Sequence, residues 1–319
     1  DRSSFIDRSS AKEMLTMLAI CTSSLHGLIA SHPSRFAASP VLASRTSNLV
    51  AQAAAPPALL ALPPAGYEGA VAAGEKKAGM KPDKIFALAM ISGAHIGFGA
   101  WLMLAVGGAC PGLAATNPGL QNIVKGAFGL PFGLMMTLVT GAELFTGNTA
   151  LVTAAVLEGK ASMKQLVKSW TVSYTGNLIG SVLLAAMVAT AGTLGPLGGA
   201  SVGTAVVKTS LPFKTALFRG ILCNWLVCMA VYMASFAKDL PGKMVAIWFP
   251  ISAFIALGLE HSVANMFIIP LGIMTGAAVS WKTFFLKNLL PVTLGNIIGG
   301  AFFVATAFSY TYGKLGSSA

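Results

Sequence analysis

Six apolar stretches dominate the chain after residue 80. A membrane-spanning helix needs about 20 consecutive apolar residues, and each stretch is at least that long. The stretches run over about 84–108, 124–157, 166–192, 213–236, 244–279 and 284–310. Lys, Arg, Asp and Glu make up only 10% of the 319 residues, against roughly 25% in a soluble domain. We therefore predict an all-α integral membrane protein with six transmembrane helices.

The net charge of +11 does not favour binding to nucleic acid. Such an interface needs Lys and Arg clustered on a solvated face, whereas here they stand singly between apolar runs. Together with the hydropathy, this excludes an ordinary soluble enzyme, a disordered chain and a nucleic-acid binder. More Lys and Arg flank the spans on the side of the two termini than on the other side, which predicts that both termini lie inside.

Residues 1–75 are expected to lie outside the folded domain, which then comprises residues 76–319. Residues 14–67 contain no Asp or Glu and are rich in Ala, Ser, Leu and Pro. This composition is typical of an organelle transit peptide, and a disordered tail is the alternative. The Pro-rich segment 53–64 indicates a linker.

Two of the apolar stretches are too long for one span, and both carry the motif Glu-x4-Asn. Each is followed by a Gly-Asn-x-x-Gly motif at nearly the same distance. The matched pairs are Glu143–Asn148 with Glu260–Asn265, and Gly176–Gly180 with Gly295–Gly299. This pattern predicts a tandem duplication of three spans, and an odd number of spans makes the second copy inverted. Inverted repeats with broken second and fifth helices indicate a binding or conduction site near the middle of the membrane.

Three ionisable side chains are expected at membrane depth, namely Glu143, Glu260 and His261. Such groups are costly in a bilayer and usually functional. The two glutamates, with Asn148 and Asn265, either hold the helix breaks, through a Lys or through backbone N–H groups, or relay protons. His261 has Leu144 as its counterpart in the first copy, so the histidine belongs to one half only. An imidazole that donates a hydrogen bond and titrates near neutral pH suits a small anion or weak acid in transit, and bracing of the backbone is the alternative.

Several features favour anions over cations as the transported species. The second halves of the broken helices are expected to begin near Thr146 and Ala264, which directs their positive dipole ends to the middle of the membrane. Basic residues outnumber acidic ones in residues 81–319, and Lys208 is expected to draw anions into a vestibule. No catalytic residues, metal or cofactor are expected, because the sequence lacks a His-x-x-Glu-His-type motif and a plausible Ser/His/Asp set.

Three motifs resemble the formate/nitrite transporter family, over about residues 80–312. They are Glu-Leu-Phe-Thr-Gly-Asn (143–148), Cys-Asn-Trp-Leu-Val-Cys (223–228) and Gly-Leu-Glu-His-Ser-Val-Ala-Asn-Met-Phe (258–267). The resemblance implies an aquaporin-like protomer with its own pore, assembled as a homopentamer in lipid. With its transit-like leader, the chain looks most like the green-algal chloroplast-envelope branch. That likeness implies an inner-envelope channel for small inorganic anions, above all bicarbonate and nitrite.

The same resemblance assigns roles to individual residues. It places His261 at the centre of the pore, near Thr146, and implies that Lys208 and Asn224 line the polar route. It also implies two apolar constrictions, one formed by Leu130 and Phe254 and the other by Leu134, Leu144 and Phe145. Position 130 is often aromatic in the family, so Leu130 predicts a wider constriction here.

Two other modes of transport remain open beside a passive anion channel. A proton-coupled carrier of weak acids could use the same residues. A neutral-solute pore of the aquaporin type fits less well, because such pores carry Asn-Pro-Ala at each break. The breaks here continue as Asn148-Thr-Ala and Asn265-Met-Phe.

Overall fold

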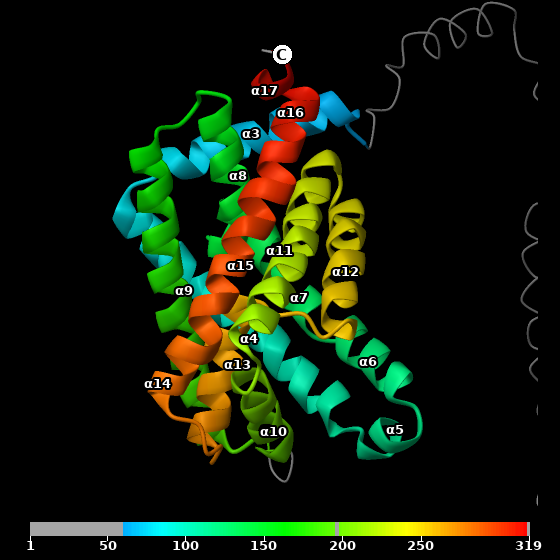
Figure 1. The fold of residues 1–319 in the computed structure, drawn as a ribbon. Helices are drawn as coiled ribbons and strands as arrows, with labels where there is room; N and C mark the ends of the chain where they lie inside the picture. Colours follow the sequence, from blue (N-terminus) through cyan, green and yellow to red (C-terminus); the bar gives the residue numbers. More distant parts are fainter. Residues whose placement is uncertain (1–59, 195–197, 318–319) are drawn as a thin grey trace, which may run out of the picture. The chain divides into compact units, whose positions relative to one another are not determined.

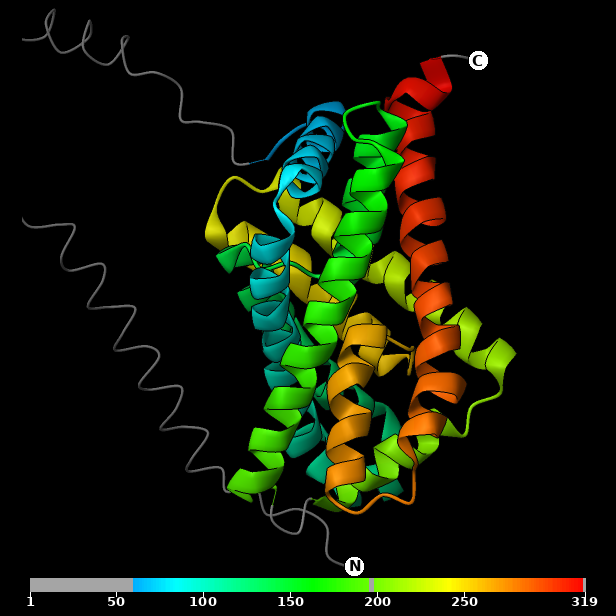
Figure 2. The same cartoon turned by 90° about the vertical axis from the view of Figure 1, so that its left-hand side faces the viewer.

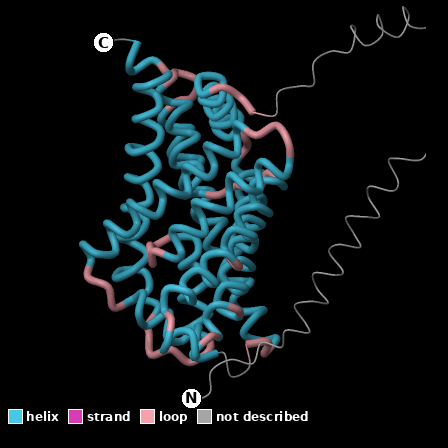
Figure 3. The backbone as a smooth tube through the Cα atoms, turned by 90° about the vertical axis from the view of Figure 1, so that its right-hand side faces the viewer, coloured by secondary structure: helices cyan, strands magenta, loops and turns pink. Residues whose placement is uncertain are grey.

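The computed structural model describes residues 60–194 and 198–317, and these residues are almost entirely helical (Figures 1 and 3). The described residues belong to one compact unit. The transit-like segment 1–59 lies outside the described residues, so its role stays a prediction.

Long helices form the frame of the bundle. These are α4 (Pro82–Ala105), α9 (Met163–Ala191), α11 (Phe213–Phe236) and a last helix made of α14 (Trp281–Thr283), η3 (Phe284–Leu289), α15 (Leu290–Gly300), η4 (Ala301–Thr306) and α16 (Ala307–Tyr312), in which η3 and η4 are π-helical. The shorter elements are α3 (Pro63–Gly79), η1 (Gly107–Ala109), α5 (Pro111–Thr116), α6 (Pro118–Ala127), α7 (Leu130–Thr140), α8 (Phe145–Leu157), α10 (Gly198–Thr209), α12 (Leu240–Ala256), α13 (Ser262–Met274) and α17 (Lys314–Ser317).

Within the described residues, five helices are long and apolar enough to cross a membrane. They are Pro82–Ala109, Pro118–Thr140, Met163–Ala191, Phe213–Phe236 and Trp281–Tyr312. An all-helical, membrane-type fold is therefore confirmed, whereas the count of six spans is not. The predicted stretch 244–279 is divided between α12 and α13, each of which is too short to count alone.

The two helix breaks occur where the sequence predicts them. One separates α7 from α8 and the other separates α12 from α13. Gly141 (φ 76°) follows α7 and Gly258 (φ 68°) follows the end of α12, and this left-handed conformation ends a helix with little strain only at glycine. The new helices begin at Phe145 and Ser262, close to the predicted starts.

Helix α3 corrects the expectation that all of residues 1–75 lie outside the folded domain. It begins at Pro63 and packs on α8 and α11 with Tyr67, Ala70 and Val71 buried. A Cβ added at Gly74 would overlap the backbone oxygen of Leu151, so only a glycine permits this approach. The helix buries mostly small side chains, and for that reason its contribution to the fold left no strong hydropathy signal.

Glu158 joins both ends of the described chain to the bundle. Its Oε1 accepts hydrogen bonds from the Tyr67 hydroxyl (2.8 Å) and from Ser309 Oγ (2.6 Å), and the backbone N–H of Lys314 donates to Oε2 (3.1 Å). Burial opposes ionisation of this carboxyl, but the hydrogen bonds outweigh burial and lower the pKa of Glu158 below its ordinary value. Consequently α3, α8 and α16 share one anchor, at the same end of the bundle (Figures 1 and 2).

We expect Gly295→Ala to destabilise the protein and Gly69→Ala to leave it intact or slightly more stable. A Cβ at Gly295 would overlap the Leu217 carbonyl oxygen, whereas nothing lies within 4 Å of one at Gly69. Overpacking of this kind costs about 1–3 kcal/mol, while Gly to Ala in an open helix position gains up to about 1 kcal/mol. The midpoint of thermal unfolding in detergent measures both effects. Equal midpoints for the two variants would contradict the close contact between α11 and α15.

Candidate functional site

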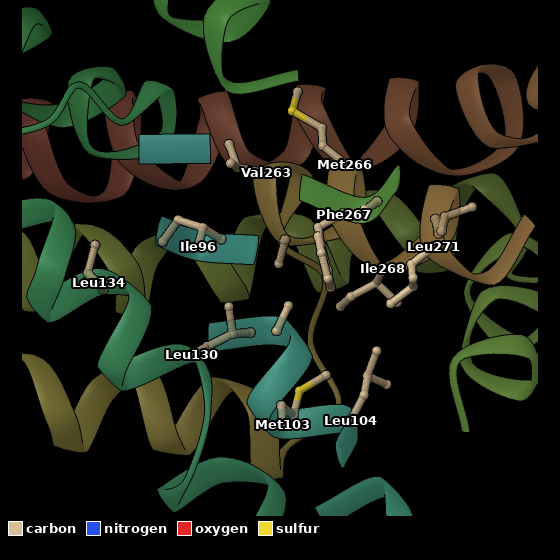
Figure 4. Close-up of a cluster of buried hydrophobic side chains, with 14 of the residues drawn as sticks. Ile96, Met103, Leu104, Leu130, Leu134, Val263, Met266, Phe267, Ile268 and Leu271 are labelled. Atoms are coloured by element: carbon tan, nitrogen blue, oxygen red, sulfur yellow. The ribbon is translucent and has the colours of Figure 1, made fainter. Parts of the chain in front are cut away.

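A cavity of about 310 Å³ lies between α4, α6, α10, α12 and α13, and we call it the vestibule. Its polar wall is formed by Asn122, Lys125, Thr204, Lys208, Arg219, Glu260, Asn265 and His261. Its apolar wall includes Met103, Leu104, Leu130 and Ile268, which are drawn in Figure 4, together with Phe254, Ile255 and Leu259. The lining helices α6 and α10 lie at the end of the bundle opposite α16 and α17 (Figure 1).

A second cavity, the chamber, is far smaller and almost wholly apolar. It measures about 10 Å³, which is roughly the space for one water molecule. It is lined by Ile96, Leu130, Leu134, Leu144, Val227, Ile251, Phe254 and His261. Leu130, Phe254 and His261 line both cavities, so these three side chains separate the vestibule from the chamber.

The structure brings together four of the five residues expected at constrictions. Leu130 and Phe254 lie where the two cavities meet, and Leu134 and Leu144 line the chamber. Phe145 does not line either cavity among the described residues.

The Phe145 ring packs edge-on against Tyr174 (4.9 Å between ring centroids) and Trp170 (6.3 Å). Successive residues at the start of a helix point about 100° apart, so Leu144 faces the chamber while Phe145 turns towards α9. The sequence did not single out Ile96, Val227 or Ile251 as lining residues, because nothing in an apolar helix marks which face meets a cavity.

His261 joins the two halves of the molecule. Its Nδ1 accepts the backbone N–H of Ala264 (3.0 Å), which makes it the N-cap of α13, and its Nε2 lies 2.9 Å from Thr146 Oγ1 on α8. A nitrogen that accepts a hydrogen bond carries no proton, so the proton of the neutral ring sits on Nε2 and points at Thr146. Adding a proton to Nδ1 would set it against the Ala264 N–H. This contact geometry therefore favours the neutral imidazole.

Each glutamate at a helix break is paired with a lysine from a different helix. Lys208 Nζ lies 2.8 Å from Glu260 Oε1, and Lys77 pairs with Glu143 in the same way. The second oxygen of Glu260 accepts from Asn265 Nδ2 (2.7 Å), and that of Glu143 accepts from Asn148 Nδ2 (2.8 Å). Lys208 thus lines the vestibule with its charge compensated by a buried carboxylate. This contact differs from the sequence expectation of a free, anion-attracting ammonium group.

Asn224 also has a different setting from the one expected. Its side chain is fully buried and lines neither cavity in the described residues. Its Nδ2 lies near Thr149 Oγ1 (2.9 Å), the Asn296 carbonyl oxygen (2.6 Å) and the Thr146 carbonyl oxygen (3.3 Å). Asn224 therefore fixes the turn of α8 that carries Thr146, the residue whose hydroxyl contacts His261.

Two further asparagines tie down the broken backbone, and the sequence showed them only as members of repeated motifs. Asn177 Oδ1 accepts the N–H of Phe145 (2.9 Å), and its Nδ2 donates to the Glu143 carbonyl (2.9 Å). Asn296 makes the matching bonds to Ser262 N–H (2.8 Å) and the Glu260 carbonyl (3.0 Å). The two breaks are therefore held by the same set of contacts.

Lys125 and Arg219 give the vestibule its uncompensated positive charge. Both side chains line the cavity, and neither has a salt bridge to a carboxylate of the described residues. Because Lys208 and Glu260 neutralise each other, the lining carries a net positive charge that attracts small anions. Residues 60–194 and 198–317 contain no group of three His, Cys, Asp or Glu side chains that could hold a metal ion.

Comparisons with known proteins identify the family of the chain. A family model described as formate/nitrite transporter matches residues 65–310, which is most of the chain. The chain belongs to the formate/nitrite transporter family. It is 44% identical to a protein named probable formate transporter from Methanothermobacter thermautotrophicus. The match covers 72% of this chain and 89% of the relative. It is 36% identical, over 70% of its length and 82% of the relative, to the nitrite transporter NirC of Escherichia coli.

Solved structures of the formate/nitrite transporter family share the fold. One described as an FNT family ion channel superposes with a TM-score of 0.71 at 31% identity, covering 77% of this chain and 98% of that one. Another, described as a pentameric formate channel with formate bound, gives 0.63 at 32% identity, covering 73% and 98%. These relatives are named transporters and channels rather than enzymes, and the chain is a multi-pass membrane protein of this family.

We expect Lys208→Met to destabilise the protein by about 3 kcal/mol or more, because it leaves the buried Glu260 carboxylate without its cation. The Lys208 and Glu260 side chains are only 14% and 3% exposed. Adding Glu260→Gln should restore much of the loss, which a double-mutant cycle on thermal unfolding would show. The matched control is Lys214→Met, on an exposed lysine, which should have little effect. An additive cycle would show that the pair does not hold the second break.

Proposed function

We propose that the protein is a channel for small monovalent anions, with a route that leads from the vestibule past His261 into the chamber. The observation that carries this proposal is the position of the neutral His261 ring. It closes a positively lined cavity and bonds across the molecule to Thr146. An ion that reaches this point meets polar hydrogens on one side and an apolar chamber on the other.

The contacts of His261 suggest how it assists an anion. The Nε2–H can turn its hydrogen bond from Thr146 Oγ1 to the ion, and the Thr146 hydroxyl can donate to the ion as well. Such donors replace part of the water that the ion loses, which lowers the large cost of entering an apolar constriction. The N-termini of α8 and α13 add a favourable dipole at the same depth.

The proposed substrates are bicarbonate, nitrite and formate, all small oxyanions. Nitrite and formate are supported by the names of the relatives, and bicarbonate by the likeness to the chloroplast-envelope branch. The acid-free leader supports a location in the chloroplast envelope, with the inner membrane proposed, for supply of inorganic carbon or nitrogen to the stroma.

The proposed architecture is an aquaporin-like protomer within a homopentamer, built from an inverted repeat of three spans. The matching hydrogen bonds of Asn177 and Asn296 support the repeat. On this reading α12 and α13 together form the broken fifth span, and the helix segments of residues 118–157 form the broken second one. The family's pentameric formate channel supports the assembly.

Proton-coupled transport of a weak acid is the second candidate, and one contact favours it. The Nε2–H of His261 is the kind of proton that could be lent to an anion in the constriction. Because Nδ1 accepts the Ala264 N–H, a new proton would then have to reach His261 at Nε2.

Flux through reconstituted protein separates these two mechanisms. With the membrane potential clamped in proteoliposomes, we expect nitrite, formate and bicarbonate to move down their gradients at rates that depend on the potential. A proton-coupled carrier would instead give potential-independent flux together with a change of internal pH. Rates equal to those of empty liposomes for all three ions would refute the proposed function.

We expect His261→Asn to preserve folding and to reduce flux about tenfold or more. Asparagine is a good N-cap, so the bond from the Ala264 N–H is kept and stability should change by less than about 1 kcal/mol. The donor that faces Thr146 is lost, and hydrogen bonds to charged groups are worth about 1.5–3 kcal/mol. His261→Phe removes both cap and donor and should lower stability as well. A His261→Asn variant with wild-type flux at every pH would exclude His261 from the route.

A further inference from the structure

We infer that the vestibule is also a binding site for organic monoanions with an apolar body, such as aryl carboxylates and sulfonates, which it holds without letting them pass. The inference rests on the proposed function for its consequence, a block of anion flux. The binding site itself rests only on the size, charge and lining of the cavity.

The two cavities differ greatly in size. The vestibule, at about 310 Å³, is at the lower end of the range of about 300–1,000 Å³ found for small-molecule sites, whereas the chamber measures about 10 Å³. Leu130, Phe254 and His261 stand between them and are each buried. A molecule with one aromatic ring therefore fits the vestibule and is stopped at these three side chains.

The charge of the lining selects an anion. Lys125 and Arg219 carry positive charge without a partner among the described carboxylates, while Lys208 is held by Glu260. A guanidinium group donates two parallel hydrogen bonds to a carboxylate or sulfonate, which adds geometric preference to the attraction. The one carboxylate in the wall, Glu260, is neutralised by Lys208, so it does not oppose the binding of an anion.

The rest of the lining selects an apolar body. Met103 and Leu104 come from α4, Phe254 and Ile255 from α12, and Ile268 from α13. Sites that hold small molecules combine such an apolar wall with a few polar groups that fix orientation. Nitrite and formate have no apolar body to bury against this wall, so the route alone does not require it.

The probe for this site is benzenesulfonate, which stays ionised and so does not cross the bilayer as a neutral acid. We expect calorimetry with the full chain in detergent to show saturable binding. Methanesulfonate, which lacks the ring, and benzyl alcohol, which lacks the charge, should each bind about tenfold more weakly or worse, as loss of one charge-assisted or apolar contact implies.

Substitutions locate the site. Arg219→Gln and Lys125→Gln should each weaken benzenesulfonate binding several-fold, whereas Lys214→Gln, an exposed lysine at the start of α11, is the matched control and should not. Thermal unfolding in detergent checks that each variant is folded. Equal affinity of wild type and the Arg219→Gln/Lys125→Gln double variant would overturn the inference.

Block of nitrite current in a planar bilayer tests the consequence. Benzenesulfonate should block from the face where α10 lies and not from the face of α16 and α17. Cleavage of a C-terminal tag by protease added to one side identifies the orientation of the channel. Block from the C-terminal face alone would overturn the inference. Nitrite flux without any binding of benzenesulfonate would overturn the inference and leave the proposed channel function standing. Binding that depends on Arg219, in a protein that passes no anion, would refute the channel function and leave the binding site standing.

Discussion

The arrangement depends on two buried carboxylates, each held at a helix break by a lysine from another helix. A charge within the membrane region is costly unless it is paired and hydrogen-bonded, and Glu143 and Glu260 meet both conditions. Each pair brings in a peripheral helix, α3 through Lys77 and α10 through Lys208. Backbone groups that the breaks leave without helical partners are hydrogen-bonded by the side chains of Asn177 and Asn296.

These pairs position the residues of the proposed ion route. Glu260 precedes His261 in the chain, so the contact with Lys208 fixes the start of α13 and the direction of the imidazole ring. Asn224 and Thr149 hold the turn of α8 that carries Thr146, whose hydroxyl oxygen lies within hydrogen-bond distance of His261 Nε2. Lys125 and Arg219 supply the uncompensated positive charge of the vestibule. Lys208 instead pairs with Glu260 and stabilises the break between α12 and α13.

Much of the candidate site was predictable because a bilayer leaves few choices for polar residues. Glu143, Glu260 and His261 stand out among apolar neighbours, and the motifs around them recur in the two halves. The side-chain directions were not predictable in the same way. Phe145 and Leu144 are neighbours of similar hydropathy, yet only Leu144 lines the chamber. Most of helix α3 was placed outside the fold because four of its six buried residues are glycine or alanine, which carry little hydropathy signal.

The sequence by itself determined the helical membrane fold, the two breaks and the ionisable residues that mark them, because apolar length and the rarity of charge are properties of the chain alone. Only the tertiary structure decided which charges are paired and which remain free. A lysine attracts anions when no carboxylate compensates its charge, and it stabilises the fold when it forms an ion pair with a buried carboxylate. Lys208 and Arg219 are alike in charge, and the packing of α10 against the second break makes the difference between them.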